Sequence, residues 1–172
     1  MASLPQRIRF DWTILTGATP LSVLIRSPAT ELEFEAYYRL RWKILREPWN
    51  QPEGSEKDNR ETEALHLAAW DDSGALLGVG RLHRVTARSG QIRYMAIEPA
   101  QRGQGVGTAI LQELENLATR SGFEEVILNA REEAVSFYRA NGYAVVRSSQ
   151  TLFGVIPHFE MRKQLKRPAP YR

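Results

Sequence analysis

The stretch of sequence that decides the fold runs from Met95 to Thr108 and reads MAIEPAQRGQGVGT. A strand-like segment ends at Ile97, three glycines follow between positions 103 and 107, and a helical pattern then begins. The first amides of a helix have no intrahelical partner, and the helix dipole favours negative charge there. Glycine lets the backbone approach a phosphate closely. The stretch therefore predicts a strand-to-helix loop that binds an anion, with a pyrophosphate as the natural guest.

Two other phosphate-binding motifs do not fit this loop. A P-loop requires Gly-Lys-Ser/Thr, whereas Val106 follows Gly105 and Thr108 follows Gly107. The dinucleotide fingerprint G-x-G-x-x-G requires a third glycine where Thr108 stands, and it belongs to a first βα unit. A connection without any ligand is the alternative, which is disfavoured because clustered glycines cost conformational entropy.

The segments around the loop predict an α+β fold, because hairpin-like strands come first and a βαβ crossover follows. The expected order is β-α-β-β-β-α-β-α-β-β, in a single mixed, mostly antiparallel sheet with helices on both faces. A capping box at Thr30–Glu33 opens the first helix, Asp71–Gly74 forms a hairpin turn, and Asn141-Gly142 ends the last helix. The expected strands are 21–26, 64–70, 75–84, 91–97, 125–129, 143–147 and 158–163, and the expected helices begin near 30, 105 and 134.

Length and composition fit one domain, which we place at residues 21–164. Residues 1–20 are interpreted as an N-terminal extension and residues 165–172 as a basic tail. The absence of cysteine excludes disulfides and thiolate metal sites, and three histidines without metal-ligand spacing favour no metal site. No signal peptide and no apolar run of membrane-spanning length is found, so a cytoplasmic protein without membrane contact is expected. The net charge of +3 is too small to indicate nucleic acid.

Residues 102–107 have the form R-x-x-G-x-G, and residues 137–143 read FYRANGY. Together these two motifs resemble the GNAT acetyltransferase superfamily. The resemblance covers roughly residues 21–164. It implies an N-acetyltransferase that moves an acetyl group from acetyl-coenzyme A to a primary amine of a small molecule or peptide, by direct attack through a tetrahedral intermediate. A non-catalytic acyl-coenzyme A sensor or scaffold with the same fold is the alternative.

The resemblance also implies a cofactor site. The pantetheine arm would pair with the backbone of Met95, Ala96 and Ile97, where the strand separates from residues 127–129. Asn129 would face the cofactor. Many members of the superfamily, however, carry their asparagine two positions later, where this chain has Arg131, and the Arg131 side chain could meet a phosphate instead. The pyrophosphate would be wrapped by the amides of Arg102, Gly103, Gln104, Gly105, Val106, Gly107 and Thr108.

Tyr138 is the candidate catalytic residue. The resemblance implies that its phenol gives a proton to the leaving thiolate. The alternative is a core residue, because Ala134, Phe137 and Tyr138 share an apolar helical face.

The acceptor site is less defined. His158, in an Ile-Pro-His segment, is a candidate substrate-binding residue, with a structural strand histidine as the equal alternative. The loop 47–62 occupies the place where the superfamily binds its acceptor, and Trp49 either packs on the acceptor there or only holds the loop in place. Its acidic residues would suit a cationic amine, although a solvated loop is the commoner explanation. They are Glu47, Glu53, Glu56, Asp58 and Glu61.

Several points stay open. The general base is not identified, and Glu63, His66, His83 and Tyr94 are expected to be solvated or structural rather than catalytic. The acceptor, the acyl length and the oligomeric state are also open, with a homodimer as one candidate.

Overall fold

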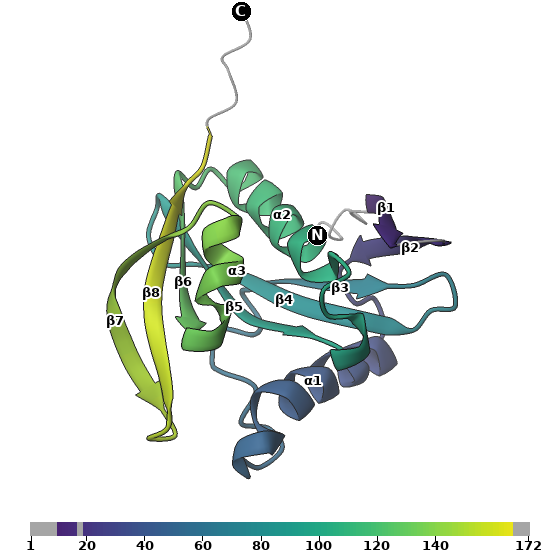
Figure 1. Ribbon diagram of the computed structural model, residues 1–172, viewed down its shortest axis with the longest axis horizontal. Coiled ribbons are helices and arrows are strands. Elements are labelled where there is room, and N and C mark those ends of the chain that lie inside the picture. Colours follow the sequence, from purple (N-terminus) through teal and green to yellow (C-terminus); the bar gives the residue numbers. More distant parts are fainter. Residues whose placement is uncertain (1–9, 17–18, 167–172) are drawn as a thin grey trace, which may run out of the picture. The chain divides into compact units, whose positions relative to one another are not determined.

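The computed structural model describes residues 10–16 and 19–166, which form a mixed sheet of eight strands in the order β1-β2-β3-β4-β5-β6-β8-β7 (Figure 1). This confirms the predicted α+β class. The strands are β1 (Phe10–Thr16), β2 (Thr19–Arg26), β3 (Leu65–Trp70), β4 (Leu76–Arg84), β5 (Ser89–Ile97), β6 (Glu125–Arg131), β7 (Ala144–Leu152) and β8 (Ile156–Gln164). The α-helices are α1 (Glu31–Leu45), α2 (Val106–Arg120) and α3 (Val135–Ala140).

The chain divides into two compact units. The first unit holds the described residues up to Arg81 together with Tyr94–Glu113. The second unit holds Leu82–Arg93 and the described residues from Leu114 onward.

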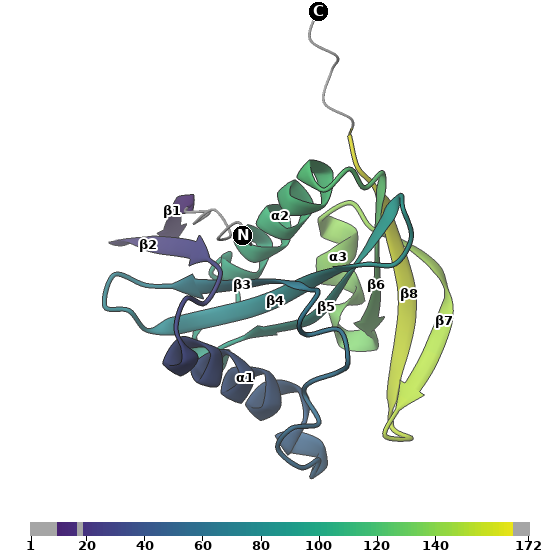
Figure 2. The same cartoon turned by 180° about the vertical axis from the view of Figure 1, so that it is seen from behind.

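In the first unit, α1 and the start of α2 lie on opposite sides of β3 and β4 (Figures 1 and 2). On one side, Tyr37 and Leu40 of α1 form a core with Val79 of β4 and with residues of β3. On the other side, a Cβ atom on Gly78 would lie 2.6 Å from Ile97 Cδ1 and 2.9 Å from Ile110 Cδ1. Gly78 therefore allows α2 to pack closely against β4.

The N-terminus of α1 carries the predicted cap. Thr30 Oγ1 accepts from the Glu33 amide at 3.2 Å. The Glu33 carboxylate accepts from the Ala29 amide at 2.6 Å and binds the Arg26 guanidinium at 2.7 Å through each oxygen. The side-chain hydrogen bond from Arg26 lowers the pKa of Glu33 to about 2. The cap thus also joins α1 to the end of β2.

The structure adds a strand, β1, that the sequence analysis had included in an extension without secondary structure. It pairs antiparallel with β2 from Phe10↔Ile25 to Thr16↔Thr19. As the first strand of the sheet order it has one neighbour. Its Phe10, Trp12 and Ile14 alternate with the polar Asp11 and Thr13, which is the period of a half-buried strand. Residues 1–9 of the predicted extension and residues 167–172 of the predicted tail lie outside the described residues.

In the second unit, β8 lies between β6 and β7 and pairs antiparallel with both. The last two strands are longer than predicted. As expected, α3 ends at a left-handed glycine: Gly142 has φ 89°, and the Tyr143 amide donates to the Tyr138 carbonyl at 3.0 Å. This turn starts β7 directly after α3.

Candidate active site

The glycine loop, defined as residues 102–108, follows β5 and opens α2 in the first unit. Gly103 and Gly105 have φ values of 75° and 88°, in the left-handed region that favours glycine. Gly103 is exposed, and a Cβ atom added to it would meet nothing within 4 Å. The loop is therefore open on the side of Gly103.

Over most of the length of this loop, the amides have no hydrogen-bond partner among the described residues. The Arg102 amide donates to the Pro99 carbonyl at 3.3 Å, and the Ala109 amide donates to the Gly105 carbonyl at 3.0 Å. Between them, the amides from Gly103 to Thr108 donate no hydrogen bond to any residue in 10–16 or 19–166. Arg102 can contribute its exposed guanidinium but not its amide, which is already engaged. Such a run of donors at a helix N-terminus suits a phosphate group.

The predicted pantetheine strand lies at the end of β5. Ala96 is buried in the core under α1, and Met95 and Ile97 are half-buried. The parallel pairing of β5 with β6 covers Ser89–Gln91 and Glu125–Ile127, whereas β5 continues to Ile97. Because Met95–Ile97 and residues 127–129 belong to different units, the predicted gap between them stays a prediction.

Tyr94 distorts β5 directly before that segment. Its φ of 56° places a bulky residue in the left-handed region, which costs roughly 1–2 kcal/mol. Cationic and acidic groups surround it: the guanidinium carbon of Arg41 lies 3.9 Å and that of Arg81 lies 4.8 Å from the ring centroid. The Tyr94 hydroxyl donates to Asp58 at 3.2 Å. These contacts fix the backbone from which Met95 continues.

The same two arginines tie down the loop 47–62, which we call the acidic loop. The Arg81 guanidinium lies 2.6 Å from a carboxylate oxygen of Asp58 and 2.6 Å from one of Glu61, and Arg41 lies 2.8 Å from Glu61. Both arginine side chains are 0% exposed. Burial alone would raise the pKa of Glu61, but the guanidiniums of Arg41 and Arg81 hold it below its ordinary value.

This arginine cluster (Arg41, Arg81, Asp58 and Glu61) corrects one expectation. Asp58 and Glu61 are neutralised within the protein, so they are not part of a negatively charged surface for an amine. In the sequence, Arg41 stands at helical spacing with the aromatic residues Tyr37 and Tyr38 of α1. A cation on an otherwise aromatic helix face, followed by an acidic loop, was the signal that could have indicated the cluster.

Tyr138 lies in the second unit, on α3. Its ring packs edge-to-face with Phe137 at 5.0 Å and with Tyr143 at 5.8 Å between centroids. Burial raises the pKa of Tyr138 to about 12, and the nearby positive charge of Arg131 opposes part of this rise. No described residue hydrogen-bonds its hydroxyl. A neutral phenol of this kind can donate a proton or a hydrogen bond but is unsuited to act as a base.

The other predicted site residues are distributed over the two units. Asn129 is exposed on β6, and its neighbour Arg131 is half-buried. His158 is buried on β8, where its Nδ1 donates to the Ile156 carbonyl at 2.9 Å. This bond agrees with the structural alternative for His158 but does not test substrate binding. Trp49 is half-buried in a short 3₁₀ turn, Glu47–Trp49, of the first unit.

His66 and Glu63, two residues for which no catalytic role was expected, form polar contacts within the first unit. His66 is buried, with its Nε2 donating to the Glu61 carbonyl at 2.8 Å and its Nδ1 3.2 Å from the Tyr37 hydroxyl. Glu63 pairs with Arg60 at 2.6 Å on the surface. Residues 10–16 and 19–166 contain no group of three or more His, Asp or Glu side chains arranged for a metal ion. No helix in the described ranges is long and apolar enough to span a bilayer.

The sequence was compared with protein families and with known proteins. A family model described as the acetyltransferase (GNAT) family matches residues 34–143. YjcF of Bacillus subtilis (strain 168), an N-acetyltransferase by name, is 33% identical over 129 residues, which cover 75% of this chain and 90% of that protein.

Solved structures share the fold. An N-acetyltransferase from Lactobacillus plantarum superimposes with a TM-score of 0.73 at 22% identity, covering 85% of this chain and 99% of that chain. An aminoglycoside 6'-N-acetyltransferase complexed with coenzyme A gives 0.68 at 17% identity, covering 83% and 95%. The matched segment includes the free amides of the glycine loop and ends at Tyr143, directly after α3. The chain therefore belongs to the GNAT family and is an acyltransferase.

Proposed function

We propose that this protein transfers an acetyl group from acetyl-coenzyme A to a primary amine of a small molecule or peptide. The observation that carries the proposal is the run of amides from Gly103 to Thr108, which have no hydrogen-bond partner in the part of the chain that the structure describes. A diphosphate supplies acceptor oxygens for such amides and negative charge for the helix dipole. The coenzyme A in the structure of the aminoglycoside 6'-N-acetyltransferase supports a coenzyme A thioester as the donor.

The chemistry proceeds by direct attack. The neutral amine nitrogen attacks the thioester carbonyl carbon, and the carbonyl oxygen becomes an oxyanion. A backbone amide in Met95–Ile97 stabilises this oxyanion, because donors aimed at developing charge lower the barrier. The carbon–sulfur bond then breaks, the sulfur receives the hydroxyl proton of Tyr138, and the proton released by the amine restores the phenol. Burial of Tyr138 keeps its proton in place until the sulfur departs.

The tightest test compares two neighbouring phenols. Tyr138→Phe and Tyr143→Phe each remove one hydroxyl from adjacent buried rings. We expect Tyr138→Phe to lower kcat by about a hundredfold while acetyl-coenzyme A affinity stays unchanged, because general acid catalysis contributes roughly 10²–10⁴-fold. Tyr143→Phe should leave kcat within about twofold, since its hydroxyl has no role in the reaction.

The assay follows release of free coenzyme A thiol with a panel of polyamines, amino sugars and peptide amines. Calorimetry with acetyl-coenzyme A measures donor binding separately. Heat of binding without thiol release for any amine would favour the sensor or scaffold alternative. Equal kcat for wild type and Tyr138→Phe would remove the proton-donor role of Tyr138, and an absence of binding heat would refute the donor itself.

A further inference from the structure

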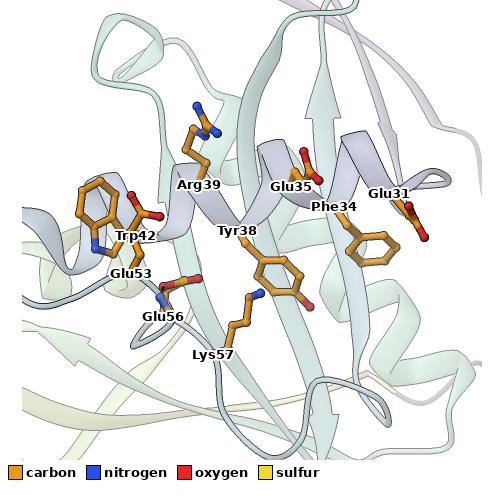
Figure 3. A pocket seen from close by; sticks show the side chains of 10 residues that line it. Glu31, Phe34, Glu35, Tyr38, Arg39, Trp42, Glu53, Glu56 and Lys57 are labelled. Carbon is orange, nitrogen blue, oxygen red and sulfur yellow. Dashed lines mark hydrogen bonds between the residues drawn. The ribbon is translucent and has the colours of Figure 1, made fainter.

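A groove with a volume of about 510 Å³ runs along the outer side of α1, between this helix and the acidic loop (Figure 3). Its volume lies within the usual range of ligand sites. We call it the α1 groove. Its lining combines aromatic rings with charged side chains: Glu31, Phe34, Glu35, Tyr38, Arg39, Trp42, Glu53, Gly54, Glu56 and Lys57. All of these residues belong to the first unit.

Aromatic rings follow one another along α1 in the groove. Phe34, Tyr38 and Trp42 stand four residues apart, so they succeed one another at intervals of about 6 Å on one helix face. All three are only half-buried, and the rings of Phe34 and Tyr38 stack at 6.0 Å between centroids. Phe34 and Tyr38 therefore form a stacked aromatic pair in the groove, and Trp42 lies one turn further along the helix.

Carboxylates border this aromatic surface. Glu31, Glu35 and Glu53 are exposed, and none of them forms an ion pair with a residue of the described ranges. Glu56 is only 4% exposed. One of its oxygens accepts from the Gly54 amide at 2.7 Å, and the other has no partner among the described residues. A nearly buried carboxylate with an unused oxygen in the lining of a groove favours a cationic ligand.

The chain itself shows how a cation binds there. The Lys57 ammonium lies 4.2 Å from the centroid of the Tyr38 ring. Figure 3 shows these two side chains beside each other. Ammonium groups are attracted to aromatic faces at this distance. The lining has four carboxylates and two cationic side chains, Arg39 and Lys57, so an excess of negative charge remains.

We propose that the α1 groove binds a linear oligoamine. Ammonium groups of the ligand pair with the unneutralised carboxylates, and its methylenes cover the rings of Phe34, Tyr38 and Trp42. A ligand with several charges along a flexible apolar chain matches acids and rings that alternate along a helix, whereas a single ammonium reaches only one end. This binding requires no acyl donor, so it can be measured apart from acyl transfer, although polyamines are also among the acceptor amines to be tested.

Calorimetry with spermidine, in the absence of acetyl-coenzyme A, tests the proposal. The variant Glu35→Gln/Glu53→Gln removes two groove carboxylates, and Asp72→Asn/Glu63→Gln removes the same charge from two exposed positions outside the groove. We expect the groove variant to weaken spermidine binding about tenfold and the control variant less than twofold, because only close pairs contribute appreciably in salt.

Further measurements complete the test. Phe34→Leu keeps an apolar side chain but removes a ring face, and should weaken binding about threefold. Butylamine, with one ammonium, should bind at least about tenfold more weakly than spermidine. Equal weakening in both double variants would mean general charge attraction and overturn the proposal, as would the absence of heat with a wild-type protein that is folded by circular dichroism. Either result leaves the coenzyme A thiol assay, and thus the acyl-transfer proposal, untouched.

Discussion

The glycine loop and the acidic loop lie in the same unit, yet they differ in whether their polar groups have partners within the protein. Between Gly103 and Thr108 the amides have no partner among the described residues. In the acidic loop, Asp58 and Glu61 are held by two fully buried arginines. Composition marks both loops as unusual. Whether the polar groups of a loop are available to a ligand depends on partners that lie elsewhere in the fold.

The strongest way to break this comparison is to open the acidic loop. Arg81→Met keeps the buried aliphatic volume but leaves Asp58 and Glu61 without their shared partner. We expect a loss of about 3 kcal/mol in the free energy of unfolding, measured by urea denaturation. Removal of one partner leaves largely buried carboxylate charge without compensation. Arg60→Gln breaks an exposed pair with Glu63 and should cost less than about 1 kcal/mol. Similar losses in both variants would show that burial of the cluster contributes little.

Hydrogen exchange sharpens the comparison without mutation. The Gly54 and Asp58 amides donate to carboxylates of Glu56 and Glu61, so ligand should not change their exchange. The amides from Gly103 to Thr108 should exchange quickly in the free protein. At acetyl-coenzyme A about a hundredfold above Kd they should slow by up to about a hundredfold, equivalent to about 2.7 kcal/mol. Unchanged exchange in the glycine loop on saturation would contradict the proposed diphosphate site.

A pair of glycine substitutions separates strain from binding. Gly103 and Gly74 have φ values of 75° and 82°, and a Cβ atom on either would meet nothing within 4 Å. Each change to alanine should cost roughly 1–2 kcal/mol of folding stability because of the left-handed backbone. Only Gly103→Ala should weaken acetyl-coenzyme A binding, by about tenfold or 1.4 kcal/mol, in calorimetry. Equal affinities would indicate that the amide geometry at Gly103 is not used.

Acid should loosen the acidic loop by a smaller amount. Burial lowers the pKa of His66, whose Nε2 donates to the Glu61 carbonyl. Below about pH 6.5 the imidazole of His66 binds a proton in the unfolded chain but not yet in the folded chain. The free energy of unfolding therefore decreases with falling pH until the pH reaches the lower pKa of the folded state. Between pH 7.5 and pH 6 the loss should be up to about 0.8 kcal/mol. The slope should shrink in His66→Gln; an identical slope in chemical denaturation would exclude His66 as its origin.

Much of this fold was predictable because its signals are local. The glycine loop, the Asp71–Gly74 turn and the Thr30 cap each depend on neighbouring residues, and the structure contains all three. β1 was missed although Phe10, Trp12 and Ile14 alternate with Asp11 and Thr13 at the period of a strand, because the alternation is short and Leu15 interrupts it.

The site was less predictable, because its decisive contacts join distant residues. Arg41 and Glu61 are separated by a whole loop, and Arg81 reaches that loop from another strand. No spacing rule connects such residues, so acids of the same loop looked equivalent in the sequence. The structure divides them: Asp58 and Glu61 are neutralised, whereas Glu53 and Glu56 line the α1 groove.

The position of β8 between β6 and β7 constrains how the chain can be synthesised. An inner strand supplies hydrogen bonds to two neighbours, and here it comes later in the chain than both of them. During synthesis on the ribosome, β6 and β7 therefore cannot complete their hydrogen bonds with β8 until Gln164 has emerged. A nascent chain that stalls before this point presents unpaired strand edges, which are sites for chaperone binding or aggregation.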